Sequence, residues 1–252
     1  MTERIWDKFL TERDKQVFQA AGFSSPSEMG KRPVLLIIDV NYNFCGDRPE
    51  PILDSIKRWH TSCGEDAWEA LPVIRRLIDA CRDKGIPVIY TTGTDGRIDG
   101  WDKGSWAFKN KRTSEHLKAT ERPNRDGNDI MDEIAPGPKD LIIRKEKPSA
   151  FFGTPLMSYL TLLKADSILV TGTTTSGCVR GSVIDAFSYN YRQWVVEDGC
   201  FDRSQASHAV NLCDMNAKYA EIVTSGAALD YIRGLPDGLF ARELPAGAAP
   251  QR

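Results

Sequence analysis

The stretch from Ser167 to Tyr191, SILVTGTTTSGCVRGSVIDAFSYNY, predicts a strand, a turn of small residues and a helix in immediate succession. Its first five residues are mostly apolar and β-branched, which is typical of a buried strand. After the turn, Val179, Val183 and Phe187 recur at helical spacing. A strand that passes through a short turn into a helix is the repeating unit of a parallel α/β sheet.

The same alternation continues on both sides of this stretch. Continuous apolar strands separated by helices are typical of a parallel sheet that is covered on both faces. We therefore expect the α/β class, with three α/β/α layers and a six-stranded, mostly parallel sheet. The expected strands are Val34–Val40, Pro87–Thr92, Asp140–Arg144, Ser167–Thr171, Gln193–Glu197 and Glu221–Thr224, and the expected helices are Trp68–Lys84, Thr154–Lys164, Cys178–Tyr191 and Gln205–Lys218.

Three segments fall outside this pattern, although the chain 1–252 is expected to form a single domain. Residues 1–30 form an amino-terminal extension, for which an interface role is one interpretation. The segment Gly93–Pro138 is charged and rich in Gly, Asp and Arg, so we expect a mostly irregular excursion that serves as a lid or an interface. Residues 236–252 are rich in Pro, Gly and Ala and are expected to form a flexible tail.

Composition excludes several classes of protein. Apolar residues make up 41% of the 252 residues and charged residues 27%, a globular mix that argues against disorder. The 33 basic and 35 acidic residues nearly balance, so there is no excess positive charge for binding nucleic acid or a membrane surface. No apolar run approaches the roughly 18 residues of a membrane span, and no signal peptide is evident. We expect a cytoplasmic protein.

The cysteines and histidines predict neither a disulfide framework nor a metal site. The six cysteines occur singly, without a C-x-x-C pair, and the three histidines lie far apart, without an H-E-x-x-H motif. The thiols of such a chain are expected to be reduced. The sequence therefore predicts no metal and no cofactor.

Ligands of a doubly wound sheet bind beyond the carboxyl ends of the strands, so the residues that end strands are the candidates. Asp39 ends an apolar run, where a carboxylate is costly to bury unless it is paired or catalytic. An Asp that caps the next turn is the alternative. Lys145 follows the strand DLIIR; the alternative is a solvated lysine, and Lys147 is a competitor for any role.

Cys178 is the sharpest candidate. A thiol at a helix amino terminus is expected to have a lowered pKa and to be a better nucleophile. The backbone N–H groups of Thr174 and Cys178 are candidate donors to an oxyanion. A buried structural cysteine is the alternative, whereas a phosphate loop is disfavoured by the absence of G-K-[ST] and G-x-G-x-x-G. If the three residues converge, Asp39 can take the thiol proton while Lys145 stabilises negative charge.

These motifs resemble the isochorismatase-like cysteine hydrolases. The resemblance spans about Pro33 to Ser225 and is carried by LLIIDVNYNF, RKEKPSAFFGTPL, ILVTGTTTSGCVRGSVIDAFSYNY and VVEDGC. It implies a six-stranded α/β/α fold with an Asp39–Lys145–Cys178 triad. It also implies a cis peptide bond before Thr174, next to the oxyanion hole, and a homodimer or homotetramer whose active sites lie close to subunit interfaces.

Departures from the family pattern narrow the expected substrate. Members that hydrolyse a vinyl ether lack the nucleophilic cysteine, so Cys178 favours amide chemistry. Metal-dependent nicotinamidases carry an Asp and His cluster after the second strand, where this chain has YTTGTDGRIDGW without a histidine. The stretches K-x-x-x-S-A-F-F-G-T and T-G-T-T-T-S-G-C-V-R most resemble the N-carbamoylsarcosine amidases, with the maleamate amidohydrolases as the nearest alternative.

Both kinds of substrate combine a small amide with a carboxylate, which needs a cation in the site. Arg203 is the first candidate and Arg180 the second, with a surface salt bridge as the alternative for either. Aromatic residues in apolar runs are otherwise typical of a core. The further candidate substrate contacts are Thr173, Phe44, Trp106, Phe151 and Phe152.

The sequence therefore predicts a hydrolase of carbon–nitrogen bonds other than peptide bonds, which releases ammonia from a small amide through Cys178. A thiol redox or binding protein that uses Cys178 without hydrolysis is the alternative from a different class.

Overall fold

A computed structural model describes residues 4–97, 99–109 and 125–241. In this part of the chain, six strands form one sheet in the order β3-β2-β1-β4-β5-β6, and all five neighbouring pairs are parallel. The predicted α/β class and six-stranded sheet are confirmed, and the sheet is wholly rather than mostly parallel. The strands are β1 (Pro33–Ile38), β2 (Val88–Gly93), β3 (Leu141–Lys145), β4 (Ser167–Thr173), β5 (Arg192–Phe201) and β6 (Glu221–Val223).

The central strands are buried along their whole length, as their apolar sequences predict. All six residues of β1 and all seven of β4 are buried. The strand β5 has ten residues, whereas the sequence predicted five, Gln193–Glu197. Its pairing with β4 shifts register between Val170 and Gly172 and then resumes, so that Phe201 pairs with Thr173. The longer strand therefore carries the chain up to the turn that holds Cys178.

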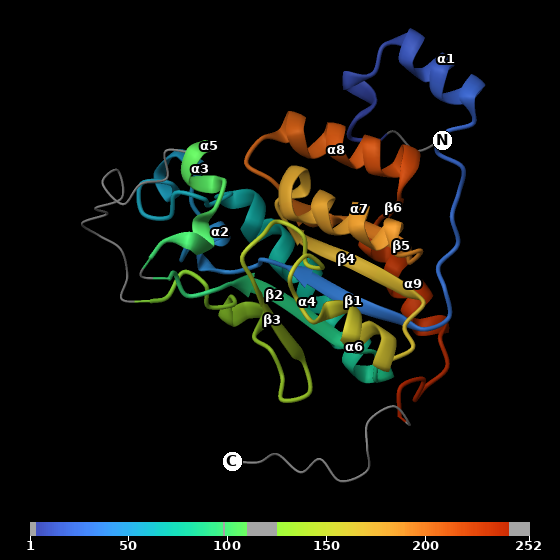
Figure 1. The fold of residues 1–252 in the computed structure, drawn as a ribbon. Helices are drawn as coiled ribbons and strands as arrows, with labels where there is room; N and C mark the ends of the chain where they lie inside the picture. The colour runs from blue at the N-terminus through green and yellow to red at the C-terminus, as the bar shows by residue number, and fades with distance from the viewer. Residues whose placement is uncertain (1–3, 98, 110–124, 242–252) are drawn as a thin grey trace.

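Helices cover both faces of the sheet, which gives the predicted three layers (Figure 1). On one face lie α4 (Glu65–Lys84) and α9 (Ser225–Gly234), and on the other lie α6 (Leu156–Leu162), α7 (Arg180–Ser188) and α8 (Gln205–Lys218). The helix α8 has the predicted bounds. The helix α9 was not predicted, although Thr224 caps it by accepting a hydrogen bond from the Ala227 N–H.

The amino-terminal extension contains a helix that the sequence did not predict, α1 (Glu12–Ala21). It begins with a capping box at Thr11 and buries none of its residues. Trp6 is buried, and the Arg4 guanidinium donates to the Ile222 carbonyl at 2.8 Å. After α1, the Ser27 carbonyl accepts a hydrogen bond from Trp194 Nε1 at 2.9 Å, and Met29 is buried. The extension is therefore attached on both sides of α1, which itself lies beyond α8, away from the sheet (Figure 1).

The described residues of the excursion after β2 are mostly irregular, with one short α-helix and two short 3-10 helices. The α-helix is α5 (Trp106–Lys109), and Ile130 pairs with Asn41 in an isolated bridge near α2 (Tyr42–Cys45). Met131 and Ile134 are buried in the core. Residues 110–124 lie outside the described part of the chain, so the role of the excursion as lid or interface stays a prediction.

The first residues of the carboxyl-terminal segment contact the rest of the chain. Phe240 is buried, with the Arg32 guanidinium 4.5 Å from its ring centroid. Arg32 also donates to the Leu239 carbonyl at 2.5 Å. Residues 239 and 240 thus contact an arginine next to β1. The flexibility of the tail stays a prediction, and residues 242–252 lie outside the described residues. No helix among those described is both long and apolar enough to cross a membrane.

Candidate active site

Asp39 lies directly after β1, at the carboxyl edge of the sheet. Its backbone is left-handed, with φ of 55°, and its N–H donates to the Thr91 carbonyl at 3.1 Å. The Thr91 hydroxyl in turn donates to Asp39 Oδ1 at 2.8 Å. Thr91 pairs with Ile38, the residue before Asp39, in the β1–β2 register. The sheet itself therefore positions the carboxylate.

Lys145 is the last residue of β3 and reaches the same carboxylate across β2. Its Nζ lies 2.7 Å from Asp39 Oδ2 and donates to the Lys147 carbonyl at 3.1 Å. The β2 residue paired with Lys145 is Gly93, which has no side chain to obstruct it. Burial lowers the pKa of Lys145, but the charge of Asp39 and the nearby Cys178 outweigh burial and raise the pKa overall. Asp39 and Lys145 are thus a buried ion pair.

Cys178 lies in a π-helical turn, Thr175–Val179, that joins β4 to α7. The α-helix begins after the cysteine, at Arg180, and not at the cysteine as predicted. The Cys178 thiol interacts with both Asp39 and Lys145. Burial and the charge of Asp39 raise the pKa of the Cys178 thiol to about 12, while Lys145 acts in the opposite direction. The expectation of a lowered pKa is therefore wrong.

The structure thus brings together the three residues that the sequence singled out. Asp39 and Lys145 form an ion pair, and the raised pKa of Cys178 favours the protonated thiol. A thiol in this state needs a base that removes its proton as it attacks. Asp39 is the charged carboxylate in contact with it. The direction of the pKa shift favours a nucleophile that is activated during attack over a standing thiolate.

The turn before Cys178 brings two backbone segments close together. The peptide bond between Thr173 and Thr174 is cis, as the resemblance implies. The Thr174 carbonyl accepts hydrogen bonds from the N–H groups of Gly177 and Val179, at 2.9 and 3.1 Å. A Cβ on Gly172, whose φ is 106°, would lie 2.2 Å from the Ile38 carbonyl oxygen, so only glycine fits there. An oxyanion hole formed by Thr174 and Cys178 stays a prediction.

Arg203 and Phe44, two of the predicted substrate contacts, adjoin each other. Arg203 follows β5, and its guanidinium lies 5.6 Å from the ring centroid of Phe44 on α2. Its Nε donates to the Thr61 carbonyl at 2.9 Å. One of the two terminal nitrogens of Arg203, Nη2, is buried and has no hydrogen-bond partner among the described residues. A buried donor of this kind is suited to an anionic ligand.

Two other candidate contacts, Arg180 and Phe151, have partners within the described chain. Arg180 is engaged with α8, since its Nη1 donates to Asn211 Oδ1 at 2.6 Å and lies 3.7 Å from Asp214 Oδ2. It is a surface pair, the alternative that the sequence left open. Phe151 belongs to the core, with its ring 5.7 Å from that of Tyr189. Its ring packs against Tyr189, directly after α7, and a substrate contact by Phe151 stays a prediction.

The remaining predicted contacts are dispersed. Thr173 is buried, and its hydroxyl donates to the Phe201 carbonyl at 3.1 Å. Trp106 lies on α5 with 37% of its surface exposed. Phe152 is exposed and lines a shallow pocket together with Gly181 and Ile184 of α7. A substrate contact by any of these three stays a prediction.

Sequence reasoning missed two polar residues of this edge. Thr91 is the donor to Asp39, and its signal was a hydroxyl near the end of the apolar run PVIYTT. Asp202 is the second buried carboxylate, 4% exposed, and it accepts hydrogen bonds from Ser176 and Arg203. No such signal was present for Asp202, because the predicted strand ended at Glu197, whereas β5 continues to Phe201.

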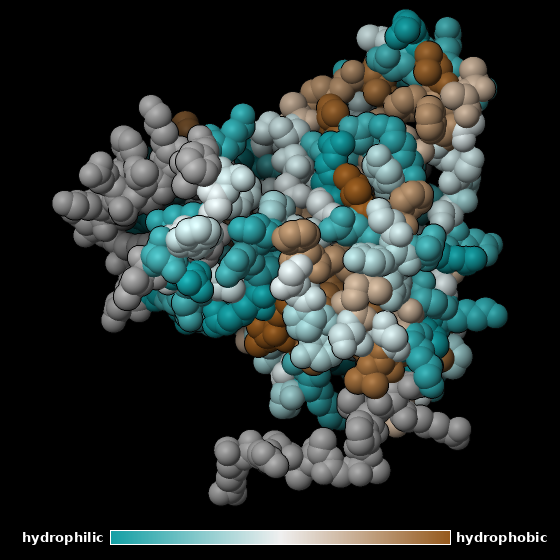
Figure 2. Space-filling model, in the orientation of Figure 1, coloured by the Kyte–Doolittle hydropathy of each residue, from teal (hydrophilic) through white to brown (hydrophobic). Residues whose placement is uncertain are grey.

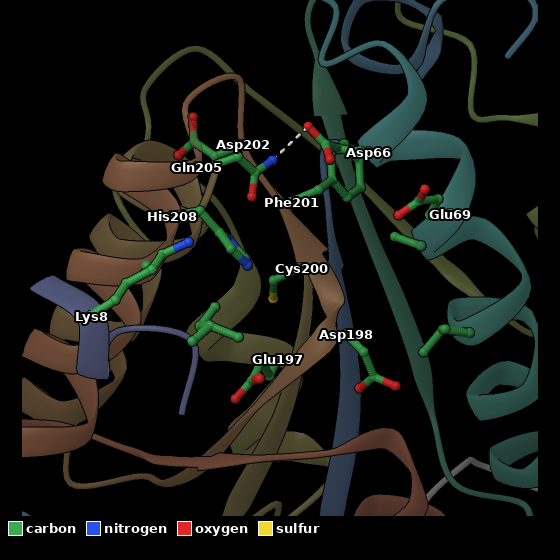
Figure 3. A pocket seen from close by; sticks show the side chains of 14 residues that line it. Lys8, Asp66, Glu69, Glu197, Asp198, Cys200, Phe201, Asp202, Gln205 and His208 are labelled. Carbon is green, nitrogen blue, oxygen red and sulfur yellow. Dashed lines mark hydrogen bonds between the residues drawn. The ribbon is translucent and has the colours of Figure 1, made fainter. Parts of the chain in front are cut away.

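A cavity of about 450 Å³ lies between α4, β5 and α8 and includes none of the three candidate catalytic residues. Figure 3 shows the side chains of Asp66, Glu69, Glu197 and Asp198 around it, together with His208. Within the described ranges, no group of three His, Cys, Asp or Glu side chains is arranged to hold a metal ion.

Comparisons with known proteins find amidohydrolases and cysteine hydrolases of similar sequence or fold. The chain is 30% identical over 230 residues to the N-carbamoylsarcosine amidase of Arthrobacter sp., which covers 89% of this chain and 80% of the relative. It is 30% identical over 162 residues to the maleamate amidohydrolase of Pseudomonas putida, covering 63% of this chain and 72% of the relative. The crystal structure of a cysteine hydrolase from Pseudomonas syringae pv. phaseolicola has the same fold, with a TM-score of 0.70 at 19% identity over 83% of this chain and 98% of that chain.

The family model of the isochorismatase domain matches residues 33–227, which include all six strands and the three candidate catalytic residues. The enzyme class predicted from the sequence, a hydrolase of carbon–nitrogen bonds other than peptide bonds, is confirmed at the level of these relatives. The chain belongs to the isochorismatase family.

Proposed function

We propose that this protein is a cysteine amidohydrolase for a small amide or N-carbamoyl compound that carries a carboxylate, with N-carbamoylsarcosine as the first candidate substrate. The observation that carries the proposal is the contact between the Asp39–Lys145 ion pair and the Cys178 thiol. The similarity to N-carbamoylsarcosine amidase and to maleamate amidohydrolase supports it, because both named substrates combine an amide or carbamoyl group with a carboxylate.

In the first half of the proposed reaction, Asp39 accepts the thiol proton while Cys178 Sγ bonds to the amide or carbamoyl carbon. The N–H groups of Thr174 and Cys178 donate to the oxyanion, and Lys145 adds positive charge. The carbon–nitrogen bond to the amide NH₂ group then breaks. Ammonia leaves with the proton from Asp39, and a thioester-type intermediate remains on Cys178.

In the second half, one water molecule attacks this intermediate while Asp39 takes its proton. The carbon–sulfur bond breaks, and Asp39 returns the proton to the sulfur. The released product is an acid. For N-carbamoylsarcosine this acid is a carbamic acid that loses carbon dioxide, so one water and one substrate give sarcosine, carbon dioxide and ammonia.

Arg203 is the proposed partner of the substrate carboxylate. Its Nη2 is buried without a partner among the described residues, and leaving such a donor unpaired is costly. Arg203→Gln should raise KM for N-carbamoylsarcosine about 10- to 100-fold, the effect of losing a hydrogen bond to a charged group. The methyl ester of the same compound, which lacks the charge, should show little difference between the two proteins. Equal losses for acid and ester would remove Arg203 from this role.

The experiment that tests the proposal is ammonia release from N-carbamoylsarcosine, maleamate, nicotinamide and biuret, with Cys178→Ser assayed in parallel. We expect turnover of N-carbamoylsarcosine and its loss in the variant. Preference for maleamate would establish the second candidate, which Arg203 suits equally. Full turnover by Cys178→Ser would contradict the mechanism. No turnover of any compound, with Cys178 still open to alkylation, would favour the redox or binding alternative.

A homo-oligomer, dimer or tetramer, is also proposed. Large apolar side chains remain exposed at Phe152, Phe187 and Tyr189, on and near α7. Figure 2 shows apolar side chains interspersed with polar ones over the part of the surface that α6, α7 and α8 form. Light scattering on the purified protein tests this proposal, since a monomer at all concentrations would contradict it.

A further inference from the structure

We infer that Asp202 is a positioning residue that fixes the Cys178-bearing turn, Thr174–Cys178, and joins it to the backbone of Arg203. This inference rests on the proposed function, because it assigns a role in the same site. Asp202 does not touch the reacting atoms in this scheme. It acts through the turn that presents them.

The Asp202 carboxylate binds the nucleophile turn with one oxygen and the N–H of the next residue with the other. Oδ2 accepts from the Ser176 N–H at 2.7 Å and from the Ser176 hydroxyl at 2.6 Å. Oδ1 accepts from the Arg203 N–H at 2.8 Å. The carboxylate is nearly inaccessible, and hydrogen bonds to an ionised acceptor are the stronger kind. Asp202 thereby sets the position of the nucleophile turn relative to the proposed carboxylate-binding arginine.

The hydroxyls of Thr173, directly before the turn, and of Thr175, within it, also bind segment 201–208. The hydroxyls of Thr173 and Thr175 both donate to the Phe201 carbonyl, at 3.1 and 3.2 Å. The Thr175 hydroxyl also lies 2.7 Å from His208 Nδ1 on α8. The side chains of Thr173, Thr175 and Ser176 therefore face segment 201–208, whereas Cys178 faces Asp39 and Lys145. Segment 201–208 therefore holds one side of the turn, and the Cys178 thiol faces Asp39 and Lys145 on the other side.

Asp202 and His208 also form part of the wall of the cavity in Figure 3, whereas no residue of the turn lines it. Thr175 and Val179, at the two ends of the π-helical turn, are fully buried. The hydrogen bonds to segment 201–208 therefore add to the packing that holds the turn. A nucleophile displaced by about 1 Å can lose roughly 100-fold in rate, so a loosened turn should reduce catalysis sharply.

The variant Asp202→Asn tests this inference, because an amide NH₂ group cannot accept the hydrogen bonds that one carboxylate oxygen accepts. We expect kcat to fall about 100-fold through misplacement of the thiol. We also expect alkylation of Cys178 by iodoacetamide at pH 8 to become about threefold faster or more, because a loosened turn exposes the thiol and takes it away from Asp39. A purely structural role would lower the melting temperature and change neither quantity in the folded protein.

Asp198→Asn is the matched control. Asp198 lies on β5, the strand that Asp202 follows. It accepts hydrogen bonds from the Ser225 N–H at 2.7 Å and the Ser225 hydroxyl at 2.5 Å, at the start of α9. It repeats the Asp–Ser arrangement away from the nucleophile, although Asp198 is more exposed. We expect both turnover and alkylation to stay within about twofold of the unmodified protein, as for a surface substitution. If Asp202→Asn behaves like Asp198→Asn, the inference is overturned.

A second variant and a substrate-free measurement cover the cases in which Asp202→Asn does not fold or no substrate is turned over. Should Asp202→Asn fail to fold, Ser176→Ala removes the 2.6 Å bond alone and should lower kcat about three- to tenfold, the effect of one hydrogen bond. An unchanged kcat in Ser176→Ala would then overturn the inference. Alkylation needs no substrate, so if no amide is turned over, the proposed function fails while the comparison of the two Asn variants still decides the role of Asp202.

Discussion

Two buried carboxylates stand at the carboxyl edge of this sheet, and they differ in their partners. Asp39 directly follows β1 and is 3% exposed; Asp202 directly follows β5 and is 4% exposed. Asp39 has a buried ammonium 2.7 Å away and contacts a thiol. Asp202 has N–H and O–H donors from Ser176 and Arg203.

The difference shows that burial alone does not indicate which carboxylate is catalytic. A carboxylate that accepts three hydrogen bonds from the main chain and a serine has little capacity left for a further proton. A carboxylate beside a thiol and an ammonium can take the thiol proton while the ammonium stabilises the negative charge that remains. The first arrangement holds a turn, and the second performs chemistry. The predictions below test this distinction.

The largest effect is expected from removing the cation of the Asp39 site. Lys145→Ala should reduce turnover about 1,000-fold, because it removes positive charge from the oxyanion and the thiolate. It should also lower the free energy of unfolding by roughly 3–5 kcal/mol, since Asp39 is left buried without its ion pair. Denaturant unfolding measures this loss. As control, Lys218→Ala breaks the exposed pair with Asp214 and should cost about 0.5 kcal/mol. Equal losses in the two variants would contradict a buried, charged pair.

A smaller effect, about tenfold per pH unit, is expected in the alkylation of Cys178. Its pKa is raised to about 12, so the thiolate is the minor form throughout the neutral range. Below its pKa, the thiolate fraction rises tenfold with each pH unit, and the alkylation rate should follow between pH 7 and pH 10 without a plateau. Iodoacetamide labelling followed by intact mass measures the rate. A plateau below pH 8 would show a standing thiolate.

The smallest effect is expected from Thr91, the orienting donor of Asp39. Thr91→Val keeps the shape of the side chain and removes the 2.8 Å hydrogen bond to Oδ1, while Lys145 stays in place. Turnover should fall about three- to tenfold, the value of one hydrogen bond. Thr161→Val, which removes an exposed hydroxyl bonded to the Met157 carbonyl on α6, should leave the steady-state rate unchanged. A loss equal to that of Lys145→Ala would mean that Thr91 does more than orient the base.

The sequence predicted the strands well because their signal is local. Runs such as VLLIIDV and SILVT are apolar throughout, and a parallel sheet buries such runs on both faces. The same logic placed Asp39, Lys145 and Cys178 at strand ends, where the parallel order brings them together. The extension of β5 to Phe201 was missed because Asp198 and Gly199 resemble a turn in sequence, whereas a register shift against β4 keeps them in the strand.

The environment of the site could not be predicted, since it depends on contacts between distant residues. The pKa of Cys178 was expected to be lowered by a helix terminus, but the burial and the Asp39 charge that raise it come from the tertiary structure. The stretch TTTSG predicted only a turn of small residues. The hydroxyls of this turn bind Phe201 and Asp202, at the end of β5 and directly after it. These residues are distant in sequence, and the pairing of β4 with β5 brings them next to the turn.

The central claim is that Asp39 activates a protonated Cys178, and Asp39→Asn with two readouts tests it most directly. Turnover should fall about 1,000-fold, within the range that general bases contribute. Alkylation of Cys178 at pH 9 should become faster, because the charge of Asp39 helps to hold the thiol pKa up and Lys145 would then act alone to lower it. Opposite changes in the two rates are the predicted result. Turnover near that of the unmodified protein, or alkylation that slows together with turnover, would contradict the account.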